Sequence, residues 1–220
     1  TVADFPIAAQ RAQIKALQSQ INPHFLNNTL EIINWEARLA DDTRVCAMIE
    51  ALSTMLTAVL DRDGRTQIPL SEELGYLDAY LYIIRERLGG NLQVTRDIPE
   101  EMTALLIPRL ILQPIVENAI LHGLEGISDS VIRVEAAQEG EDLLITVTDN
   151  GHGLPPDMIG HPYRRESAPS GHHLGLFNVD TILKKHYGER YGLYLDNNPA
   201  GSGARVRARL PLRRREEEEC

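Results

Sequence analysis

Apolar residues recur with helical spacing along the first ninety positions of the chain. Two runs, with gaps of mostly three or four residues, lie on either side of a short polar link at 41–43, where Asp42 and its neighbours offer a helix cap. The first run comprises Ile14, Leu17, Ile21, Leu26, Leu30, Ile33 and Ala37, and the second comprises Val45, Met48, Ile49, Leu52, Met55, Leu56 and Val59. Because the link is short, the pattern predicts an antiparallel helical hairpin.

The predicted hairpin has one apolar face that two helices alone cannot bury. Pairing two copies in a four-helix bundle would bury this face, so we expect a homodimer. A turn is predicted at 61–65, and a third helix from Ser71 to Gly89 and Gly90, with Leu74, Leu77, Leu81, Ile84 and Leu88 in line.

From residue 91 onward the pattern changes to mixed helix and strand. Strands are predicted at 92–98, 131–137, 143–148, 191–196 and 204–210, and helices at 108–122 and 174–186. The segment 151–171 is polar and holds three prolines, so we expect a mobile loop there. The expected fold class is α+β: a helical region at 1–90, an α/β sandwich domain at 91–213 and a charged tail at 214–220.

Net charge, cysteine content and the length of apolar runs make some classes of function unfavourable for this chain. The chain has 220 residues with a net charge of −10, which makes nucleic acid an unfavourable partner. Its two cysteines, Cys46 and Cys220, provide no disulfide framework and suit a reducing cytoplasm. We expect no membrane span, because no run approaches the roughly 18 apolar residues that one needs.

The segment 20–30 places His24 directly after a proline within a helical pattern. Pro23 lacks an N–H and its ring disfavours helical geometry at Asn22, so the helix either kinks or restarts with Asn22 as its cap. At 3.6 residues per turn, Asn28 lies on the side of His24, and the apolar positions lie opposite. A lone histidine is most often an ordinary surface or half-buried residue. The polar surroundings and the deformed helix favour a reactive imidazole instead.

A second group of polar residues, Glu117, Asn118 and His122, falls at the end of the helix predicted at 108–122. Asn118 and His122 are four residues apart and would share a helix face. The amide oxygen of asparagine suits Mg²⁺, and a histidine can donate a hydrogen bond to a phosphate. A polar stripe on a surface helix accounts for the same residues equally well.

Two glycine-containing segments follow. Asp149 to Gly153 comes after a predicted strand; such a segment alone is more often a hairpin turn. Alternatively, Asp149 accepts a hydrogen bond from the exocyclic amine of adenine, while Gly151 and Gly153 allow close backbone approach and positive φ. The segment 171–175 opens a helix, whose first N–H groups favour phosphate. The chain has no P-loop sequence.

The segment 17–30, Leu-Gln-Ser-Gln-Ile-Asn-Pro-His-Phe-Leu-Asn-Asn-Thr-Leu, resembles the phosphoacceptor motif of the LytS/YesM-type sensor histidine kinases. The resemblance implies that His24 takes a phosphoryl group from ATP. In order and spacing, the three later clusters are similar to the N, G1 and G2 boxes of the Bergerat-fold ATPases. The likeness runs from about residue 17 to residue 212 and implies a Bergerat-fold ATP-binding domain.

The resemblance also implies roles for single residues. Asn118 would hold Mg²⁺, Glu117 and His122 would lie at the phosphates of ATP, and Asp149 would read adenine. The loop over the nucleotide would be shaped by Gly151, Gly153, Gly171 and Gly175. The chain departs from the family pattern at three positions: Asn27 replaces an aromatic residue, His173 a glycine, and Ala204 a threonine that supports the adenine-reading carboxylate.

The implied reaction is autophosphorylation of His24, followed by transfer to an aspartate of a response regulator. A neutral imidazole already carries a lone pair, so attack on the γ-phosphorus needs positioning more than deprotonation. Phe25 stands where many histidine kinases have an acid, which leaves Glu117 as a candidate base if the two domains close over each other. Asn28 is expected to serve the reverse removal of phosphate from the regulator, with Asn27 as the competing candidate.

Two other interpretations remain open. The first is a nucleotide-binding dimeric scaffold that lacks phosphotransfer, favoured by His173 in place of the glycine. The second is a metal site formed by His161, His172 and His173, although no acid or cysteine completes the ligand set. The chain begins at Thr1 without a methionine, and relatives of this type usually carry membrane spans before this region. We therefore expect the cytoplasmic portion of a longer cell-membrane protein.

Overall fold

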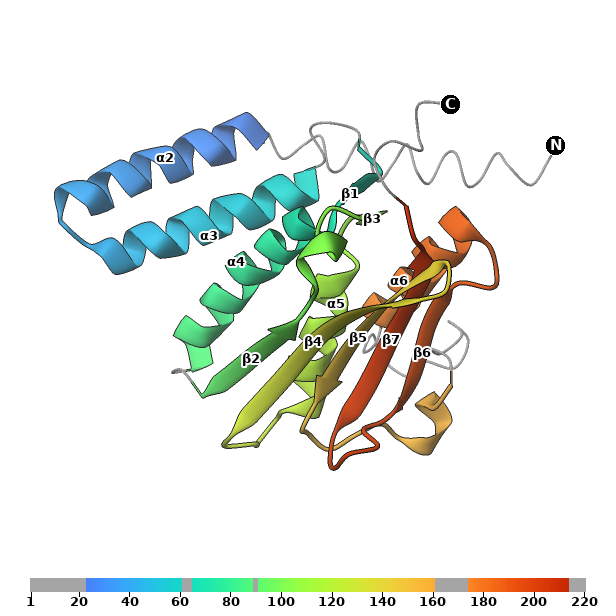
Figure 1. Ribbon diagram of the computed structural model, residues 1–220. Helices are drawn as coiled ribbons and strands as arrows, with labels where there is room; N and C mark the ends of the chain where they lie inside the picture. Colours follow the sequence, from blue (N-terminus) through green and yellow to red (C-terminus); the bar gives the residue numbers. More distant parts are fainter. Residues whose placement is uncertain (1–22, 61–64, 89–90, 161–173, 214–220) are drawn as a thin grey trace, which may run out of the picture. The chain divides into compact units, whose positions relative to one another are not determined.

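The structure, a computed structural model, describes residues 23–60, 65–88, 91–160 and 174–213 (Figure 1). The chain divides into two compact units, Thr1–Gly64 and Arg65–Cys220. The predicted turn at 61–65 and the tail at 214–220 lie almost wholly outside the described residues, as does the segment before Pro23.

The first unit contains a hairpin of two helices, α2 (Pro23–Leu39) and α3 (Thr43–Leu60). Asp41 takes a left-handed conformation with φ of 55°, which turns the chain. The Asp42 side chain then caps α3, because its Oδ1 accepts a hydrogen bond of 3.0 Å from the backbone N–H of Val45. The predicted hairpin and its cap are confirmed.

Few apolar side chains of the hairpin are buried. Ala37, Ile49, Ala51 and Ala58 are buried, whereas Phe25 and Trp35 are 65% and 64% exposed. The other exposed large apolar residues of the hairpin are Ile32, Ile33, Leu39, Val45, Met48, Leu52 and Val59. The two helices therefore leave most of their apolar surface uncovered by each other.

The expectation that no run approaches the apolar content of a membrane span is wrong for α3. Among the described residues, this is the one helix whose length and composition are sufficient, with a mean hydropathy of 1.4 over Thr43–Leu60. The high value arises because apolar residues occupy several faces of α3, and only 11% of the window is buried.

The second unit is a sheet of five strands covered by helices. The strand order is β2-β4-β5-β7-β6, with β2 parallel to β4 and the other pairs antiparallel. The strands are β2 (Leu92–Asp97), β4 (Ser130–Glu139), β5 (Asp142–Asp149), β6 (Gly192–Asn197) and β7 (Ala204–Pro211). Figure 1 shows α4 (Leu70–Leu88), α5 (Leu112–Asn118) and α6 (Leu174–Tyr187) behind this sheet. The predicted α/β sandwich is confirmed.

Short elements complete this unit. They are the strands β1 (Gln67–Pro69) and β3 (Leu106–Pro108) and the turns η1 (Glu100–Met102), η2 (Ala119–Gly123) and η3 (Pro156–Met158). Inward-facing side chains of the sheet, such as Ile132, Val147 and Leu195, are buried, and the α6 residues Leu176 and Leu183 are buried as well. The apolar core thus lies between the sheet and its helices.

The helix predicted at 108–122 begins later than expected. Pro108 pairs with Gln67 in the small antiparallel sheet of β1 and β3, and Leu110 has a φ of +56°. A left-handed residue cannot continue a right-handed helix, so α5 starts only at Leu112. From Ala119 the helix continues as the π-helical turn η2.

The division of the chain also falls earlier than position 90. Helix α4 belongs to the second unit, because its apolar face packs there. Leu70, Leu77 and Leu81 are fully buried, as is the Ile68 side chain of β1. The Glu73 carboxylate accepts hydrogen bonds from the residues that precede and begin α5.

Candidate functional site

Asp149 ends the central strand β5 and is the most deeply buried acid among the predicted site residues, at 5% exposure. Its Oδ1 accepts two hydrogen bonds, 2.9 Å from the Gly151 N–H and 3.0 Å from the Ala204 N–H. Within the described chain, no hydrogen bond reaches Oδ2. Burial raises the pKa of Asp149, and the two N–H groups oppose that shift. One carboxylate oxygen is therefore fixed by the protein, and the other accepts no hydrogen bond from the described residues.

The backbone around Asp149 approaches closely at three glycines. A side chain at Gly151 would overlap the carbonyl of Gly123, and one at Gly203 would overlap the carbonyl of Asp149 itself. Gly123 also faces the Asp149 carboxylate, with only 3.1 Å between a built Cβ and its Cγ. The N–H of His152 donates to the Gly123 carbonyl over 3.0 Å. The loop after β5 is thereby joined to the end of the turn η2.

The glycines of the Asp149 segment do not share one function. Gly153 has a φ of +80°, as expected, and a side chain there would meet Asn197 Oδ1 at 2.8 Å. Gly151 lacks positive φ, so the part of the prediction that gave it this conformation is wrong; its requirement is close backbone approach. Gly203, with a φ of +100°, was not predicted. Its only sequence signal is its position directly before Ala204.

Gly151→Ala is expected to destabilise the second unit and to weaken nucleotide binding. Its methyl group must displace the Gly123 carbonyl, which is backbone and cannot rotate away as a side chain would. Overpacking of this kind costs about 1–3 kcal/mol. Thermal unfolding would measure the effect. Gly201→Ala is the matched control, because a side chain at Gly201 meets open space and its φ is ordinary. Equal melting temperatures for the two variants would contradict the described packing.

Glu117 and Asn118 are the last two residues of α5 and are half-buried. The charge of Glu117 reaches Tyr80 of α4: burial, and then this charge, raise the pKa of Tyr80 to about 12. The carboxylate of Glu117 therefore lies close to the buried face of α4.

His122 lies in the π-helical turn, where the Leu124 N–H bonds to the Ala119 carbonyl over 3.0 Å. A π turn closes its hydrogen bonds between residues five apart, so the helix changes type directly after Asn118. The side chain of His122 lies outside the described part of the structure. That Asn118 and His122 share a helix face therefore stays a prediction.

The third glycine cluster is described only in part. Gly171 and His173 lie outside the described residues. Gly175 is in the first turn of α6, where a built Cβ would be 3.3 Å from the Cβ of Pro114 in α5. A side chain at Gly175 would therefore press against α5 where α6 packs on it.

His24 and Asn28 lie in α2, in the first unit. The His24 side chain is outside the described residues, whereas Asn28 is exposed. On the opposite side of the helix, Leu26 and Leu30 are half-buried and Ala37 is buried, as predicted. Ile33, at 45% exposure, is more exposed than the rest of this face.

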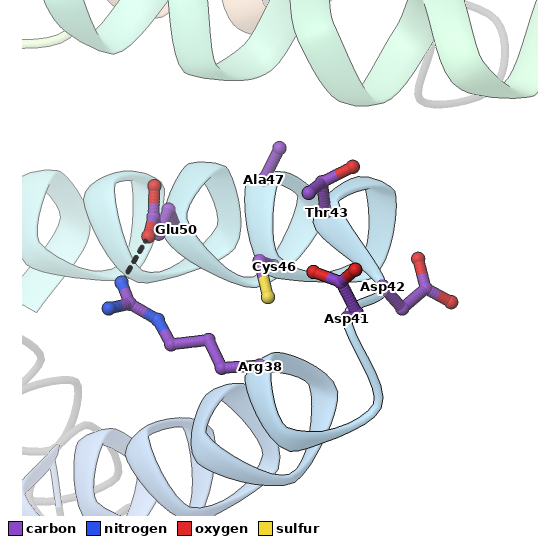
Figure 2. Close-up of a pocket in the computed structure, with 7 residues that line it drawn as sticks. All are labelled: Arg38, Asp41, Asp42, Thr43, Cys46, Ala47 and Glu50. Carbon is purple, nitrogen blue, oxygen red and sulfur yellow. Dashed lines mark hydrogen bonds and ion pairs between the residues drawn. The ribbon is translucent and has the colours of Figure 1, made fainter.

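A cavity of about 300 Å³ lies at the turn of the hairpin (Figure 2). It is lined by Arg38, Asp41, Asp42, Thr43, Cys46, Ala47 and Glu50, none of which is a predicted site residue. Arg38 and Glu50 form an exposed ion pair of 2.9 Å, and Asp42 caps α3. These polar side chains serve the hairpin itself.

The donor set of the second unit fits magnesium held through a nucleotide. No group of three or more potential ligands from His, Cys, Asp and Glu occurs in the described residues, and the histidines at 161, 172 and 173 lie outside them. One amide oxygen, that of Asn118, is a suitable ligand for Mg²⁺, which keeps waters and binds phosphate oxygens. An all-protein metal cage would need more oxygen ligands than this.

Comparisons with known proteins agree with the order of the two units. A histidine kinase family model matches residues 12–92. Sensor histidine kinase YesM of Bacillus subtilis (strain 168) is 34% identical over 205 residues, covering 93% of this chain and 34% of YesM. Sensor histidine kinase YpdA of Escherichia coli (strain K12) is 38% identical over 188 residues, covering 85% of this chain and 32% of YpdA. The chain thus spans about a third of the length of these relatives.

Among solved structures, the mycobacterial sensor histidine kinase MprB superposes with a TM-score of 0.50 at 21% identity. The match covers 67% of this chain and 97% of the MprB chain, and it shows a shared fold. A further family model, that of the histidine kinase-, DNA gyrase B- and HSP90-like ATPases, matches residues 104–214, half of the chain. The resemblance to LytS/YesM-type sensor histidine kinases is confirmed, and the chain belongs to the histidine kinase-, DNA gyrase B- and HSP90-like ATPase family.

Proposed function

We propose that this chain is the kinase core of a two-component sensor histidine kinase, which transfers the γ-phosphoryl group of ATP to His24. The observation that carries the proposal is the order of the two family matches in one chain. The histidine kinase match contains His24, and the ATPase match contains the buried Asp149, whose Oδ2 accepts no hydrogen bond from the described residues. From His24 the phosphoryl group passes to an aspartate of a response regulator.

In this proposal the second unit binds ATP. Oδ2 of Asp149 accepts the hydrogen bond of the exocyclic amine of adenine, while the Gly151 and Ala204 N–H groups hold Oδ1. Asn118 supplies an oxygen ligand to Mg²⁺, and Glu117 and His122 lie towards the phosphates. Gly151, Gly153, Gly171 and Gly175 allow the backbone to follow the nucleotide. When bound, Mg²⁺ neutralises charge on the phosphate oxygens.

The chemical step is an in-line displacement. A ring nitrogen lone pair of His24 forms the new N–P bond, and the bond between the γ-phosphorus and the bridging oxygen breaks, so ADP leaves with that electron pair. The proton on the other ring nitrogen is then lost to a base, for which Glu117 is our candidate. Little covalent activation is required of the protein, so positioning supplies most of the rate.

We also propose that the chain works as a homodimer. The exposed apolar residues of α2 and α3, with Trp35 and Leu39 at 64% and 68% exposure, need a covering surface. A second hairpin would supply one in a four-helix bundle. The proposed location is the cytoplasmic portion of a cell-membrane sensor, with the receiver domain of a response regulator as the other partner and no nucleic acid.

Incubation with Mg²⁺ and γ-labelled ATP tests this function. We expect stable labelling of the protein from γ-labelled ATP and none from α-labelled ATP, because only the terminal phosphoryl group is transferred. A nucleotide-binding scaffold would bind ATP with normal affinity but gain no label from either compound. That result would replace the kinase proposal by the scaffold interpretation.

Asn28→Ala is expected to slow dephosphorylation of the cognate regulator while His24 is still phosphorylated. Asn28 is one helical turn after His24, about 6 Å along the axis, and is exposed. Its amide can therefore align a water on an aspartyl phosphate that is docked at His24. Phosphate release from the purified phosphorylated regulator would be timed with and without the variant.

Asn27→Ala is the matched control for this prediction. The Asn27 side chain is half-buried, and its Oδ1 is a buried atom without a hydrogen bond in the described structure. It is therefore less accessible to a docked regulator than Asn28. Loss of autophosphorylation in Asn28→Ala, to the level of a His24 variant, would show that Asn28 serves the forward step or the fold.

A further inference from the structure

Glu73 of α4 is a buried acid outside the residues assigned to ATP. It is 1% exposed and lies on the apolar face of α4, beside Leu70, Leu74 and Leu77. A carboxylate in such surroundings is costly unless hydrogen bonds compensate the lost water. Within the described residues no ion pair of Glu73 is present, although the pKa of Glu73, which burial raises, is lowered in part by the positive charge of Arg109.

The compensating hydrogen bonds come from the start of α5. Glu73 Oε2 accepts from the Leu110 N–H and Oε1 from the Leu112 N–H, both over 2.9 Å. Burial raises the pKa of Glu73, and the N–H groups of Leu112, Leu110 and Ile111 oppose that rise. Both carboxylate oxygens are thus engaged by backbone donors that have no partner within the helix.

The segment that Glu73 holds is strained. Leu110 has a φ of +56°, a conformation that residues other than glycine rarely adopt, and it lies two positions before α5. Such conformations persist where surrounding contacts over-determine them. The bond from the Leu110 N–H to Glu73 is a contact of this kind.

A second part of α4 lies near the end of α5 that carries Glu117 and Asn118. Tyr80 is seven residues after Glu73, two turns along the same face, and is buried. The charge of Glu117 contributes to the raised pKa of Tyr80, so Glu117 lies near this part of α4. One face of α4 therefore binds the beginning of α5 and lies near the end that carries Glu117 and Asn118.

We propose that Glu73 is a positioning residue, whose carboxylate fixes the first turn of α5 and through it the placement of Glu117 and Asn118. The inference rests on the proposed function for its consequence, since those two residues are assigned to the phosphates and Mg²⁺. It predicts that Glu73 affects the metal–phosphate end of the nucleotide more than the adenine end, which Asp149 holds from β5.

The test compares Glu73→Gln with Glu72→Gln. Glutamine keeps the size of Glu73 but places an amide N–H₂ against one of the two backbone donors. Glu72 is the matched control, because its carboxylate bonds to Arg65 and Tyr76 rather than to α5. Hydrogen exchange over 110–118 and calorimetric binding of adenosine and of Mg²⁺ with a non-hydrolysable ATP analogue would be measured for each variant.

In Glu73→Gln we expect faster exchange over 110–118 with unchanged exchange in β4 and β5. Binding of the Mg²⁺–analogue complex should weaken about tenfold, as for one lost charged hydrogen bond, and adenosine binding should change little. Glu72→Gln should resemble the wild type in both measurements. Unchanged exchange over 110–118, or an equal loss for adenosine and the Mg²⁺ complex, would overturn the proposal.

Leu110→Gly, combined with Glu73→Gln, provides a second test. Glycine adopts positive φ without strain, so it removes the need for Glu73 to hold this conformation. We expect Glu73→Gln to cost less affinity for the Mg²⁺ complex in a Leu110→Gly background than in the wild type. An equal cost in both backgrounds would overturn the proposal. Hydrogen exchange over 110–118 does not depend on phosphotransfer. If the wild type bound ATP but gained no label, the kinase function would be refuted, and the role of Glu73 would still be tested by exchange.

Discussion

Replacing His24 by glutamine is expected to reduce labelling from γ-labelled ATP to background while ATP binding is unchanged. Glutamine offers hydrogen bonds but no nucleophilic nitrogen, so the N–P bond cannot form. The proposed ATP site lies in the second unit, whereas His24 lies in the first, which is why binding and labelling should separate. Labelling would be followed by filter retention, and binding by calorimetry.

His186→Gln is the matched control for this prediction. His186 lies in the last turn of α6 and is exposed, so its loss should leave both labelling and binding at wild-type levels. If the His24 variant kept half of the wild-type label, another residue would be the acceptor. If it lost ATP binding as well, the separation of the two functions between the units would be wrong.

Replacing Asp149 by asparagine is expected to weaken ATP binding strongly without loss of fold stability. The asparagine carbonyl can keep both hydrogen bonds that Oδ1 accepts from Gly151 and Ala204. Its amide N–H₂ then takes the place of Oδ2 and faces the adenine amine, donor against donor. Loss of a hydrogen bond to a charged group costs about 1.5–3 kcal/mol, or roughly tenfold to a hundredfold in affinity.

The expectation that Asp149→Asn keeps the stability of the fold follows from the direction in which the pKa of Asp149 is shifted. Burial raises the pKa of Asp149, so the folded state binds the proton more tightly than the unfolded state does. Stability from this group is therefore present at low pH and is lost as the pH rises through the folded pKa. At neutral pH the ionised carboxylate opposes folding, and Asp149→Asn should melt at the same temperature as the wild type or higher.

Asp196→Asn is the opposite case and serves as the control. Hydrogen bonds from Arg205 lower the pKa of Asp196, and ion pairs join it to Arg205 and Arg207 at 2.7 and 3.0 Å. Its substitution should lower the melting temperature and leave ATP binding intact. If Asp149→Asn bound ATP as the wild type does, Asp149 would not be the residue that reads adenine.

Elements with a long, regular pattern could be predicted from the sequence. The alternation around Gly140 gave the β4–β5 hairpin, and the apolar spacing of the first sixty residues gave α2 and α3. The three-residue strands β1 and β3 could not be predicted, because they are too short to show alternation and pair across 37 or more positions. That pairing also delays α5, through the left-handed Leu110, which no local signal indicates.

For the candidate site, the motifs predict which residues take part but not what surrounds them. Asp149 is held by Ala204, which is 55 positions away, and Gly203 makes room for this contact. An alanine at position 204 still supports the carboxylate, since its backbone N–H is the donor. Glu73 belongs to no sequence motif, so only its burial and its backbone partners in the structure indicate its role.

Mapping of the phosphorylated residue in the wild-type protein tests the central claim most directly. After incubation with Mg²⁺ and γ-labelled ATP, the protein would be digested and analysed by mass spectrometry under alkaline conditions, because a phosphoramidate is labile in acid and stable in base. We predict a single phosphorylated peptide that contains residues 23–30, with the phosphate on His24. An acid-stable phosphate, or one on any other residue, would contradict the assignment of His24 as the phosphoacceptor.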